Sequence, residues 1–294
     1  MNVEDPAAED YQLLDFGCGE KLERFGDAVV RRMTPSVGYR ERKNHPRWNS
    51  VDCQYKKTNI NGGSGSWHYH NFDPPWVVEL GGIRFQLKTT PSGQVGVFPE
   101  QMQNWKWIED SQCVKPELKA INLFGYTGGT TMALAKQGVA ITHVDSSKSV
   151  VNWARANSEL NGLGDAPIRW IVEDAIKFMR REIKRGNCYD ILIADPPSFG
   201  RGPKGESWKI QKDIEKLIAN AFELTQGNPT LMVLTCHTEG ISETILQRQI
   251  RQQFLSNARL PSGIRLDAVG LKLTAETGKS LSSGVCVRWH QQGI

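Results

Sequence analysis

The strongest constraint on the fold is a regular alternation of short apolar runs with longer amphipathic stretches, which begins near residue 118. The apolar runs read KAINLF, VAITHV, PIRWIV, YDILIA and PTLMVLT, and each has the length of a buried strand. Between them lie stretches long enough for a helix and charged on one side, at 130–137, 149–161, 175–185 and 208–224. Alternation of this kind predicts an α/β fold in which helices cover both faces of a parallel sheet.

The two ends of the chain depart from this alternation. After PTLMVLT, a helical stretch near 242–255 is followed by the β-rich runs IRLDAVGLKLT and GVCVRWH, which predict an antiparallel hairpin at the edge of the sheet. The first 95 residues contain more Gly, Pro and Trp and lack the helix-strand rhythm. We therefore expect a Rossmann-like domain at 96–294, preceded by a small, mostly β amino-terminal domain at 1–95, with 97–115 as the connector.

Composition excludes several classes of protein. Lys and Arg number 36 against 32 acidic residues, so the net charge of +4 is far from that of a histone-like nucleic-acid binder. The six cysteines never approach the two-residue spacing of a zinc or redox motif, and no secretory signal precedes them. No apolar run reaches the roughly 20 residues of a membrane-spanning helix. We expect a soluble, cytoplasmic protein with no metal and no membrane contact.

Basic side chains gather in one segment of the amino-terminal part. Residues 31–57 contain only two acidic residues, Glu41 and Asp52. Their basic residues are Arg31, Arg32, Arg40, Arg42, Lys43, Arg47, Lys56 and Lys57. This segment is either a contact surface for a polyanion or ordinary solvated surface.

Two glycine-rich turns are candidates for bringing the backbone close to a nucleoside-like ligand. The first is DFGCG, from Asp15 to Gly19, and a DPPW sequence follows it at Asp73. However, Gly19 is followed by EKLERFGDA rather than by an apolar helix and a second buried strand, and Asp73 is preceded by the polar HYHN. The context therefore disfavours the first turn.

The second turn, NLFGYTGG at 122–129, lies between the strand KAINLF and the helical run TTMALAKQG. The next strand ends in Asp145, 20 residues after Gly125, where a carboxylate can accept the ribose hydroxyls of a cofactor. The alternative is that Asp145 only caps the helix that begins near Ser149. The predicted cofactor-binding residues here are Phe124, Gly125, Tyr126, Thr127, Gly128, Asp145 and Ser146.

The third strand ends in Glu173-Asp174-Ala175. In this architecture an acidic residue at that place faces the adenine amino group, which adds Asp174 and Ala175 to the predicted cofactor site. Helix capping is the alternative role for Asp174.

The strand YDILIA runs directly into the sequence DPPSFG, which begins at Asp195. A carboxylate followed by two prolines at the carboxyl end of a buried strand predicts a rigid loop beside the cofactor. Many enzymes that methylate nitrogen or carbon of a planar, electron-rich group use such a loop to grip the ring. Asp195 and Pro196 are therefore predicted to lie at the cofactor, and Asp195 is also a predicted catalytic residue.

The strand PTLMVLT delivers Cys236 beside this loop. C5 of cytosine or uracil is a poor nucleophile until a thiolate adds to C6, after which C5 can attack a methyl sulfonium. We predict that Cys236 supplies this thiolate while Asp195 hydrogen-bonds the N3 edge of the ring. The alternative is a buried, inert cysteine. No role is assigned to His237.

Together these motifs resemble the class I S-adenosylmethionine-dependent methyltransferases related to the bacterial 23S ribosomal RNA cytosine-C5 and guanine-N7 enzymes. The resemblance spans most of the chain and rests on EKLERFG, GVFPEQ, NLFGYTGG, VDSS, ARANSELNGL, DPPSFGRGPKGE and LTC. It implies an S-adenosylmethionine cofactor, a small β amino-terminal module, and a position over the cofactor for Gln101 of the GVFPEQ segment. The cytosine-C5 enzymes carry a cysteine at the position of Cys236 and the guanine-N7 branch does not, which favours cytosine.

The function that this resemblance implies is methylation of a base in ribosomal RNA. The sequence leaves three alternatives open: an N-methyltransferase acting on guanine or another planar nitrogen, a dinucleotide dehydrogenase, and a catalytically silent RNA-binding module. The dehydrogenase is disfavoured because Gly125, Gly128 and Gly129 do not fit G-x-G-x-x-G. Oligomeric state is not indicated. Candidates for phosphate contacts are Lys177, Arg180, Arg181, Lys184, Arg185, Arg201, Lys204 and Lys209.

Overall fold

The computed structural model describes residues 10–34, 37–38, 43–57, 65–70, 72–255 and 263–291. The chain forms two compact units, the first made of 1–103 with 272–283 and the second of 104–271 with 284–294. The first unit thus extends beyond residue 95, the boundary predicted from the sequence, and takes in a segment near the carboxyl terminus. The domain boundary itself stays a prediction.

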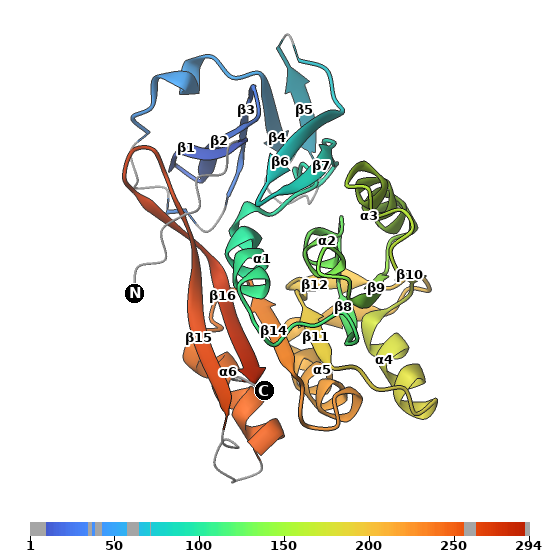
Figure 1. Cartoon of the computed structure of the whole chain (residues 1–294). Coiled ribbons are helices and arrows are strands. Elements are labelled where there is room, and N and C mark those ends of the chain that lie inside the picture. Colours follow the sequence, from blue (N-terminus) through green and yellow to red (C-terminus); the bar gives the residue numbers. More distant parts are fainter. Residues whose placement is uncertain are drawn as a thin grey trace. The chain divides into compact units, whose positions relative to one another are not determined.

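The second unit is built on a seven-stranded sheet with the order β10-β9-β8-β11-β14-β16-β15 (Figure 1). Five strands are parallel to one another: β8 (Lys119–Leu123), β9 (Ala140–Asp145), β10 (Ile168–Val172), β11 (Ile191–Ala194) and β14 (Leu231–Cys236). β16 (Ser280–Gln291) pairs antiparallel with β14, and β15 (Ile264–Thr274) forms the edge. The predicted Rossmann-like sheet with a carboxyl-terminal hairpin is confirmed.

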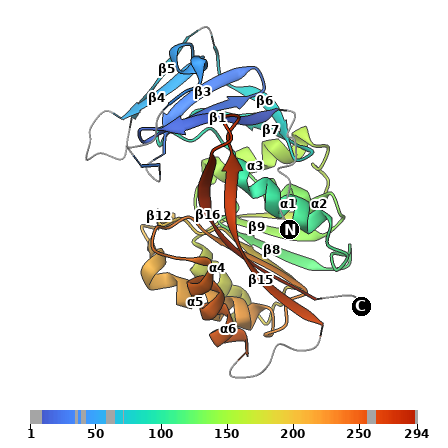
Figure 2. The same ribbon diagram turned by 90° about the vertical axis from the view of Figure 1, so that its left-hand side faces the viewer.

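Helices cover both faces of this sheet. They are α1 (Met102–Glu109), α2 (Gly129–Ala135), α3 (Lys148–Leu160), α4 (Ala175–Lys184), α5 (Ile210–Leu224) and α6 (Glu243–Leu255). Figure 2 shows α4, α5 and α6 together on one side of the strands and α1 and α2 on the other. Two elements were not predicted: α1, which lies within the expected connector, and a short hairpin of β12 (Phe199–Arg201) and β13 (Ser207–Lys209) after the Asp-Pro-Pro sequence.

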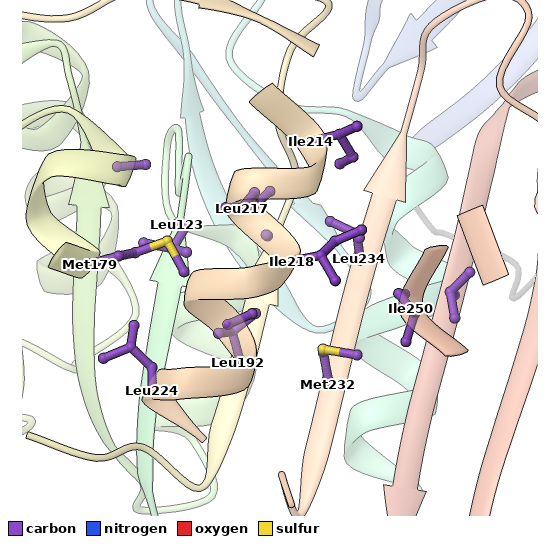
Figure 3. Close-up of a cluster of buried hydrophobic side chains, with 14 of the residues drawn as sticks. Leu123, Met179, Leu192, Ile214, Leu217, Ile218, Leu224, Met232, Leu234 and Ile250 are labelled. Carbon is purple, nitrogen blue, oxygen red and sulfur yellow. The ribbon is translucent and has the colours of Figure 1, made fainter. Parts of the chain in front are cut away.

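Alternate residues of the parallel strands enter two separate cores, as expected for strands buried on both faces. On β11, Leu192 belongs to the core beneath α4, α5 and α6, whereas Ile193 belongs to the core beneath α1 and α2. Figure 3 shows the first of these cores, with side chains of β8, β11 and β14 against those of the helices. No described helix is long and apolar enough to span a membrane.

The first unit is mostly β, as predicted. Its larger sheet has five strands in chain order and its smaller sheet has two. The strands are β1 (Tyr11–Gly17), β2 (Glu20–Phe25), β3 (Ala28–Met33), β4 (Cys53–Lys57), β5 (Gly65–Tyr69), β6 (Trp76–Leu80) and β7 (Ile83–Leu87). The 3-10 turn η1 (Pro46–Asn49) lies between β3 and β4, and η2 (Pro99–Gln101) follows β7.

The disfavoured glycine turn, DFGCG, is the tight connection between β1 and β2. Its carboxylate, Asp15, is fully buried and accepts hydrogen bonds from the backbone N–H of Asn44 (2.7 Å) and the indole N–H of Trp48 (2.7 Å). These bonds fix the position of Asn44, which precedes η1, and of Trp48, which lies in η1. The turn is therefore used for packing within the first unit.

Four of the eight basic side chains in the segment at 31–57 form ion pairs inside the first unit. Arg32 is buried and bonds Glu23, whose pKa falls to about 2 because the cost of burial is outweighed by the charges of Arg32 and Lys21. Arg31 and Lys43 both pair with Glu20, and Arg47 pairs with Asp52. Arg40 and Arg42 lie outside the described residues. Lys56 and Lys57, at the end of β4, are exposed, so both interpretations of the segment stay open.

The core in Figure 3 generates a stability prediction. Leu192 is 1% exposed, so replacing it with Ala leaves a cavity and should lower the free energy of unfolding by about 2 to 5 kcal/mol. Urea denaturation followed by circular dichroism measures this change. The control is Ile245→Ala on α6, where the side chain is 37% exposed and a much smaller loss is expected. Equal losses for the two variants would show that Leu192 is not a core residue.

Candidate functional site

The carboxyl ends of β8, β9, β11 and β14 meet along one edge of the sheet in the second unit. The N–H of Gly125, just after β8, donates to the carbonyl of Val144 on β9 (3.0 Å). The N–H of Asp195, just after β11, donates to the carbonyl of Leu123 on β8 (3.4 Å). The Thr235 hydroxyl on β14 donates to the Asp195 carboxylate. The sheet therefore brings together the strand ends that carry the predicted cofactor and reaction residues.

The loop after β8 has an unusual backbone. Phe124 and Tyr126 adopt left-handed conformations, with φ of 56° and 46°, although neither is glycine. Such conformations cost about 1 to 3 kcal/mol each and cluster at ligand sites. Gly128, which follows with φ of 93°, immediately precedes α2 and presents the start of that helix at the loop. The predicted residues Phe124 to Gly128 thus form a sharply folded turn between strand and helix.

A buried histidine lies directly under this turn. A Cβ on residue 125 would stand only 2.5 Å from Cε1 of His143, so glycine allows the backbone to rest on the imidazole ring. Nδ1 of His143 is 2.9 Å from Oγ1 of Thr131, which also accepts from the side-chain amide of Asn122 (2.9 Å). Burial lowers the pKa of His143 to about 3, so the ring is neutral at physiological pH.

Asp145 holds the turn from the side. Its carboxylate accepts from the N–H of Tyr126 (3.1 Å) and from the N–H of Ser147 (2.9 Å), and burial raises its pKa. The N-cap of α3 is Ser147, so the alternative that Asp145 merely caps this helix is wrong. Ser146, the residue between Asp145 and Ser147, is half-buried. Further along α3, the amide of Asn157 donates to the Thr127 carbonyl (3.1 Å).

Asp174 is the N-cap of α4, and its carboxylate accepts from the N–H of Lys177 (2.9 Å). The capping alternative for Asp174 is therefore confirmed. A carboxylate oxygen can accept more than one hydrogen bond, so this role leaves the predicted contact to adenine open. Ala175, the first residue of α4, is buried. The contacts of Asp174 and Ala175 with a cofactor stay predictions.

Asp195 lies in a compact polar group on one face of the sheet. Its Oδ1 atom accepts from Thr235 and is 3.0 Å from Nε2 of His237. Pro196 is buried, and the following carbonyl, that of Pro197, accepts from the indole N–H of Trp208 (2.6 Å). The loop is thus fixed on both sides of its two prolines, as the sequence predicts.

Cys236 is the last residue of β14, and its side chain faces away from this polar group. Side chains alternate along a strand, so Cys236 and its neighbour Thr235 point to opposite faces. Thr235 bonds Asp195, whereas Cys236 is 1% exposed and belongs to the core beneath α5 and α6. Burial raises the pKa of the thiol, hydrogen bonding with Thr238 opposes this, and the negative charge of Asp195 raises the pKa further. The predicted nucleophile is therefore near Asp195 in space, but its side chain is enclosed in the core.

Gln101 lies in η2 of the first unit and is buried there. Its position over the cofactor stays a prediction. Among the described residues, no group of three or more His, Cys, Asp or Glu side chains is arranged to hold a metal ion.

The strand-end turn and the carboxylate beside it fit a nucleoside cofactor, since they join a closely approaching backbone to an acceptor for ribose hydroxyls. A family model described as S-adenosylmethionine-dependent methyltransferase matches residues 56–253, about two thirds of the chain. The chain belongs to this family. The predicted family, the enzyme class and the S-adenosylmethionine cofactor are thereby confirmed.

Similar proteins support this assignment. A crystal structure of an S-adenosylmethionine-dependent methyltransferase from Agrobacterium tumefaciens is 33% identical, with a TM-score of 0.87, and the match covers 98% of this chain and 92% of that one. Ribosomal RNA large subunit methyltransferase I of Aeromonas salmonicida is 26% identical over 71% of this chain and 50% of that protein. Methyltransferase K of Neisseria meningitidis is 26% identical over 65% and 53%. The chain thus spans about half the length of these two curated relatives.

The residues that pack under the turn after β8 and against the Asp-Pro-Pro loop are not predicted from the sequence. His143, Thr131 and Asn122 are ordinary strand and helix positions in the sequence, and Asn157 lies within an amphipathic helix. The sequence predicts Trp208 as the first residue of the helix at 208–224, whereas the residue lies in β13 and its indole N–H bonds the Asp-Pro-Pro loop. The sequence holds no local signal for these contacts, because each depends on a residue between 9 and 30 positions away.

The contact between Gly125 and His143 generates a binding prediction. Gly125→Ala forces the turn away from the ring and should weaken S-adenosylhomocysteine binding about tenfold or more, measured by isothermal titration calorimetry. The control is Gly164→Ala, where a Cβ would make an ordinary contact of 3.7 Å with Glu159. Adding His143→Ala to Gly125→Ala should restore part of the affinity. Unchanged binding in the single variant would contradict the proposed position of the cofactor.

The buried imidazole also generates a pH prediction. An unfolded histidine titrates near pH 6.5, whereas folded His143 has a pKa of about 3. Below pH 6.5 the unfolded state therefore binds a proton that the folded residue does not, and stability is lost as the pH falls. Between pH 7 and pH 5 the wild type should lose about 2 kcal/mol more of its free energy of unfolding than His143→Gln. Urea denaturation at both pH values tests this, and equal losses would refute it.

Proposed function

We propose that this chain transfers the methyl group of S-adenosylmethionine to a base of ribosomal RNA. The observation that carries the proposal is the position of the Asp195 loop, whose backbone N–H bonds the end of β8. The turn that follows β8, from Phe124 to Gly128, is where we propose that the cofactor binds, and we call it the cofactor turn. A carboxylate held there can grip a planar ring beside the reacting methyl group. The names of the relatives from Aeromonas and Neisseria support RNA of the large ribosomal subunit as the substrate. A cytoplasmic location goes with this proposal.

The residues proposed to bind the cofactor share the strand-end edge, apart from Gln101 of the first unit. S-adenosylmethionine supplies an electrophilic methyl group on sulfur. Asp145 accepts the ribose hydroxyls, Asp174 and Ala175 lie at adenine, and the turn after β8 approaches the rest of the cofactor. The full proposed set is Gln101, Phe124, Gly125, Tyr126, Thr127, Gly128, Asp145, Ser146, Asp174, Ala175, Asp195 and Pro196.

Within this function, we propose C5 of cytosine as the methyl acceptor. The Cys236 thiol loses its proton and its sulfur adds to C6 of the ring, which makes C5 nucleophilic. Asp195 hydrogen-bonds the N3 edge and stabilises the adduct. After C5 has taken the methyl group, a base removes the C5 proton and the thiolate leaves from C6, so the aromatic ring is restored. This route requires the enclosed thiol of Cys236 to reach the ring.

A second candidate is methylation of a ring or exocyclic nitrogen, and the burial of Cys236 favours it. Asp195 and His237 already lie on the face opposite the thiol and are bonded to each other. A carboxylate there can accept a hydrogen bond from the nitrogen that is methylated. In this reaction Cys236 would be a core residue.

Replacing Cys236 with Ala separates the two reactions. If the thiol is the nucleophile, methyl transfer should fall about 1,000-fold or more, as when a covalent nucleophile is removed, while S-adenosylhomocysteine binding stays within about twofold. The assay measures tritiated methyl transfer to ribosomal RNA from cells lacking the protein, followed by mass analysis of the nucleosides. The matched control is Cys286→Ala, another buried cysteine, on the neighbouring strand β16.

Each result has a distinct meaning. Loss of 5-methylcytidine only in Cys236→Ala supports the cytosine route. A fully active Cys236→Ala variant refutes the thiol mechanism, and an N-methylated base in the product then identifies the second candidate. Failure of the wild-type protein to methylate any ribosomal RNA would contradict the proposed function as a whole.

A further inference from the structure

The unpredicted hairpin after the Asp-Pro-Pro sequence has two different faces. In its register Phe199 pairs with Lys209, Gly200 with Trp208, and Arg201 with Ser207. Directly paired side chains of an antiparallel ladder share a face, and successive pairs alternate between faces. Trp208 and Gly200 therefore form one face, and Phe199, Arg201, Ser207 and Lys209 form the other.

The face of the hairpin that carries Trp208 packs against the Asp195 loop and the turn after β8. The Trp208 side chain is buried, its indole N–H donates to the Pro197 carbonyl (2.6 Å), and its ring centroid is 5.0 Å from that of Phe124 in the cofactor turn. Ser198, immediately before the hairpin, is 2.7 Å from the Thr238 hydroxyl beyond β14, and its carbonyl accepts from Ile210 (3.1 Å). The hairpin is thus fixed beside the Asp195 loop rather than free to move away.

The opposite face is exposed and contains an aromatic ring among polar side chains. Phe199 is 54% exposed, the largest exposure among the large hydrophobic side chains described. A single exposed apolar side chain is common on protein surfaces, but this ring is held beside the Asp195 loop and is open to stacking by a planar ligand. Arg201, Ser207 and Lys209 share this face and are all exposed.

The charge around Phe199 is cationic. The acidic residue of the hairpin, Glu206, is half-buried; it accepts from the N–H of Lys204 (2.8 Å) and pairs with the amine of Lys177 (3.3 Å). In the part of the chain that the structure describes, no carboxylate forms an ion pair with the side chains of Arg201, Lys204 or Lys209. The exposed face therefore presents positive charge on both sides of an aromatic ring.

We propose that this face, Phe199, Arg201, Ser207 and Lys209 together with Lys204 in the turn, binds single-stranded RNA next to the nucleotide that is methylated. Phe199 stacks on a base flanking the target, and the cationic side chains contact the phosphates on either side. An acidic protein segment would satisfy the charges, but it offers a planar partner only where it carries an aromatic or arginine side chain, whereas every nucleotide carries a planar base. The inference rests on the proposed function and adds to it where the RNA strand lies.

Stacking and charge can be tested separately by fluorescence anisotropy with a fluorescein-labelled, unstructured RNA 12-mer. Phe199→Ala should weaken binding about tenfold at every salt concentration, because one base loses its stacking partner. Phe199→Tyr keeps an aromatic ring and should bind like the wild type. Ile245→Ala, which removes an exposed apolar side chain from α6, is the matched control and should leave the affinity unchanged.

The charge variants should show a different signature. Arg201→Gln and Lys209→Gln should each weaken binding at low salt and reduce the slope of log affinity against log salt by about 1, because each removes one phosphate contact. Phe199→Ala should leave that slope unchanged. Arg251→Gln, on the exposed side of α6, is the control for a lost positive charge. Affinity for S-adenosylhomocysteine should stay within about twofold in every variant, which shows that the fold is intact.

The outcomes distinguish this inference from the proposed function. If the wild type binds and methylates RNA but Phe199→Ala binds within twofold of it, the stacking surface is refuted and the proposed function stands. If Phe199→Ala and Phe199→Tyr lose affinity equally, the ring is not stacked on a base and the inference is again wrong. If the wild type neither binds nor methylates RNA and transfers methyl groups to a protein instead, both proposals fail.

Discussion

The structure of the site depends on one contact, the backbone of Gly125 resting on the buried, neutral ring of His143. The ring cannot move aside, because Thr131 holds it and Asn122 holds Thr131. Because Gly125 is fixed in this way, the N–H of Tyr126 can donate a hydrogen bond to Asp145, and the carbonyl of Thr127 can accept one from Asn157. The buried hydrogen bonds from Asn122 to Thr131 and between Thr131 and Nδ1 of His143 give the turn a rigid support, which is what strained residues at a binding turn require.

The second half of the site is set by the alternation of side chains at the strand ends. Asp195 and Thr235 project to the same face and bond each other, and His237 joins them. Trp208 then fixes the loop that follows, and its ring also reaches Phe124 of the cofactor turn. Trp208 therefore contacts both the cofactor turn and the Asp-Pro-Pro loop, and it fixes their positions relative to each other.

The sequence was sufficient for the sheet, because buried parallel strands and amphipathic helices leave a strong periodic signal. It also located the turn at Gly125 and the loop at Asp195, since both are defined by residues adjacent in the chain. It could not show His143 under the turn, nor the hairpin of β12 and β13, whose strands have three residues each and fall below any periodic signal. It could not show which basic residues of the segment at 31–57 are paired, because Glu20 and Glu23, which neutralise Arg31 and Arg32, lie outside that window.

The alternation that places Thr235 on Asp195 also encloses Cys236, and this sets the difference between the two candidate reactions. Thr235 and His237 contact Asp195 on one face of the sheet, whereas the Cys236 side chain belongs to the core on the other. In the proposed cytosine reaction, attack by sulfur therefore requires Cys236, the last residue of β14, to turn out of the core. Methylation of a nitrogen needs no such change, since the groups that would contact it already share a face. The two proposed reactions thus differ in whether the end of β14 must rearrange.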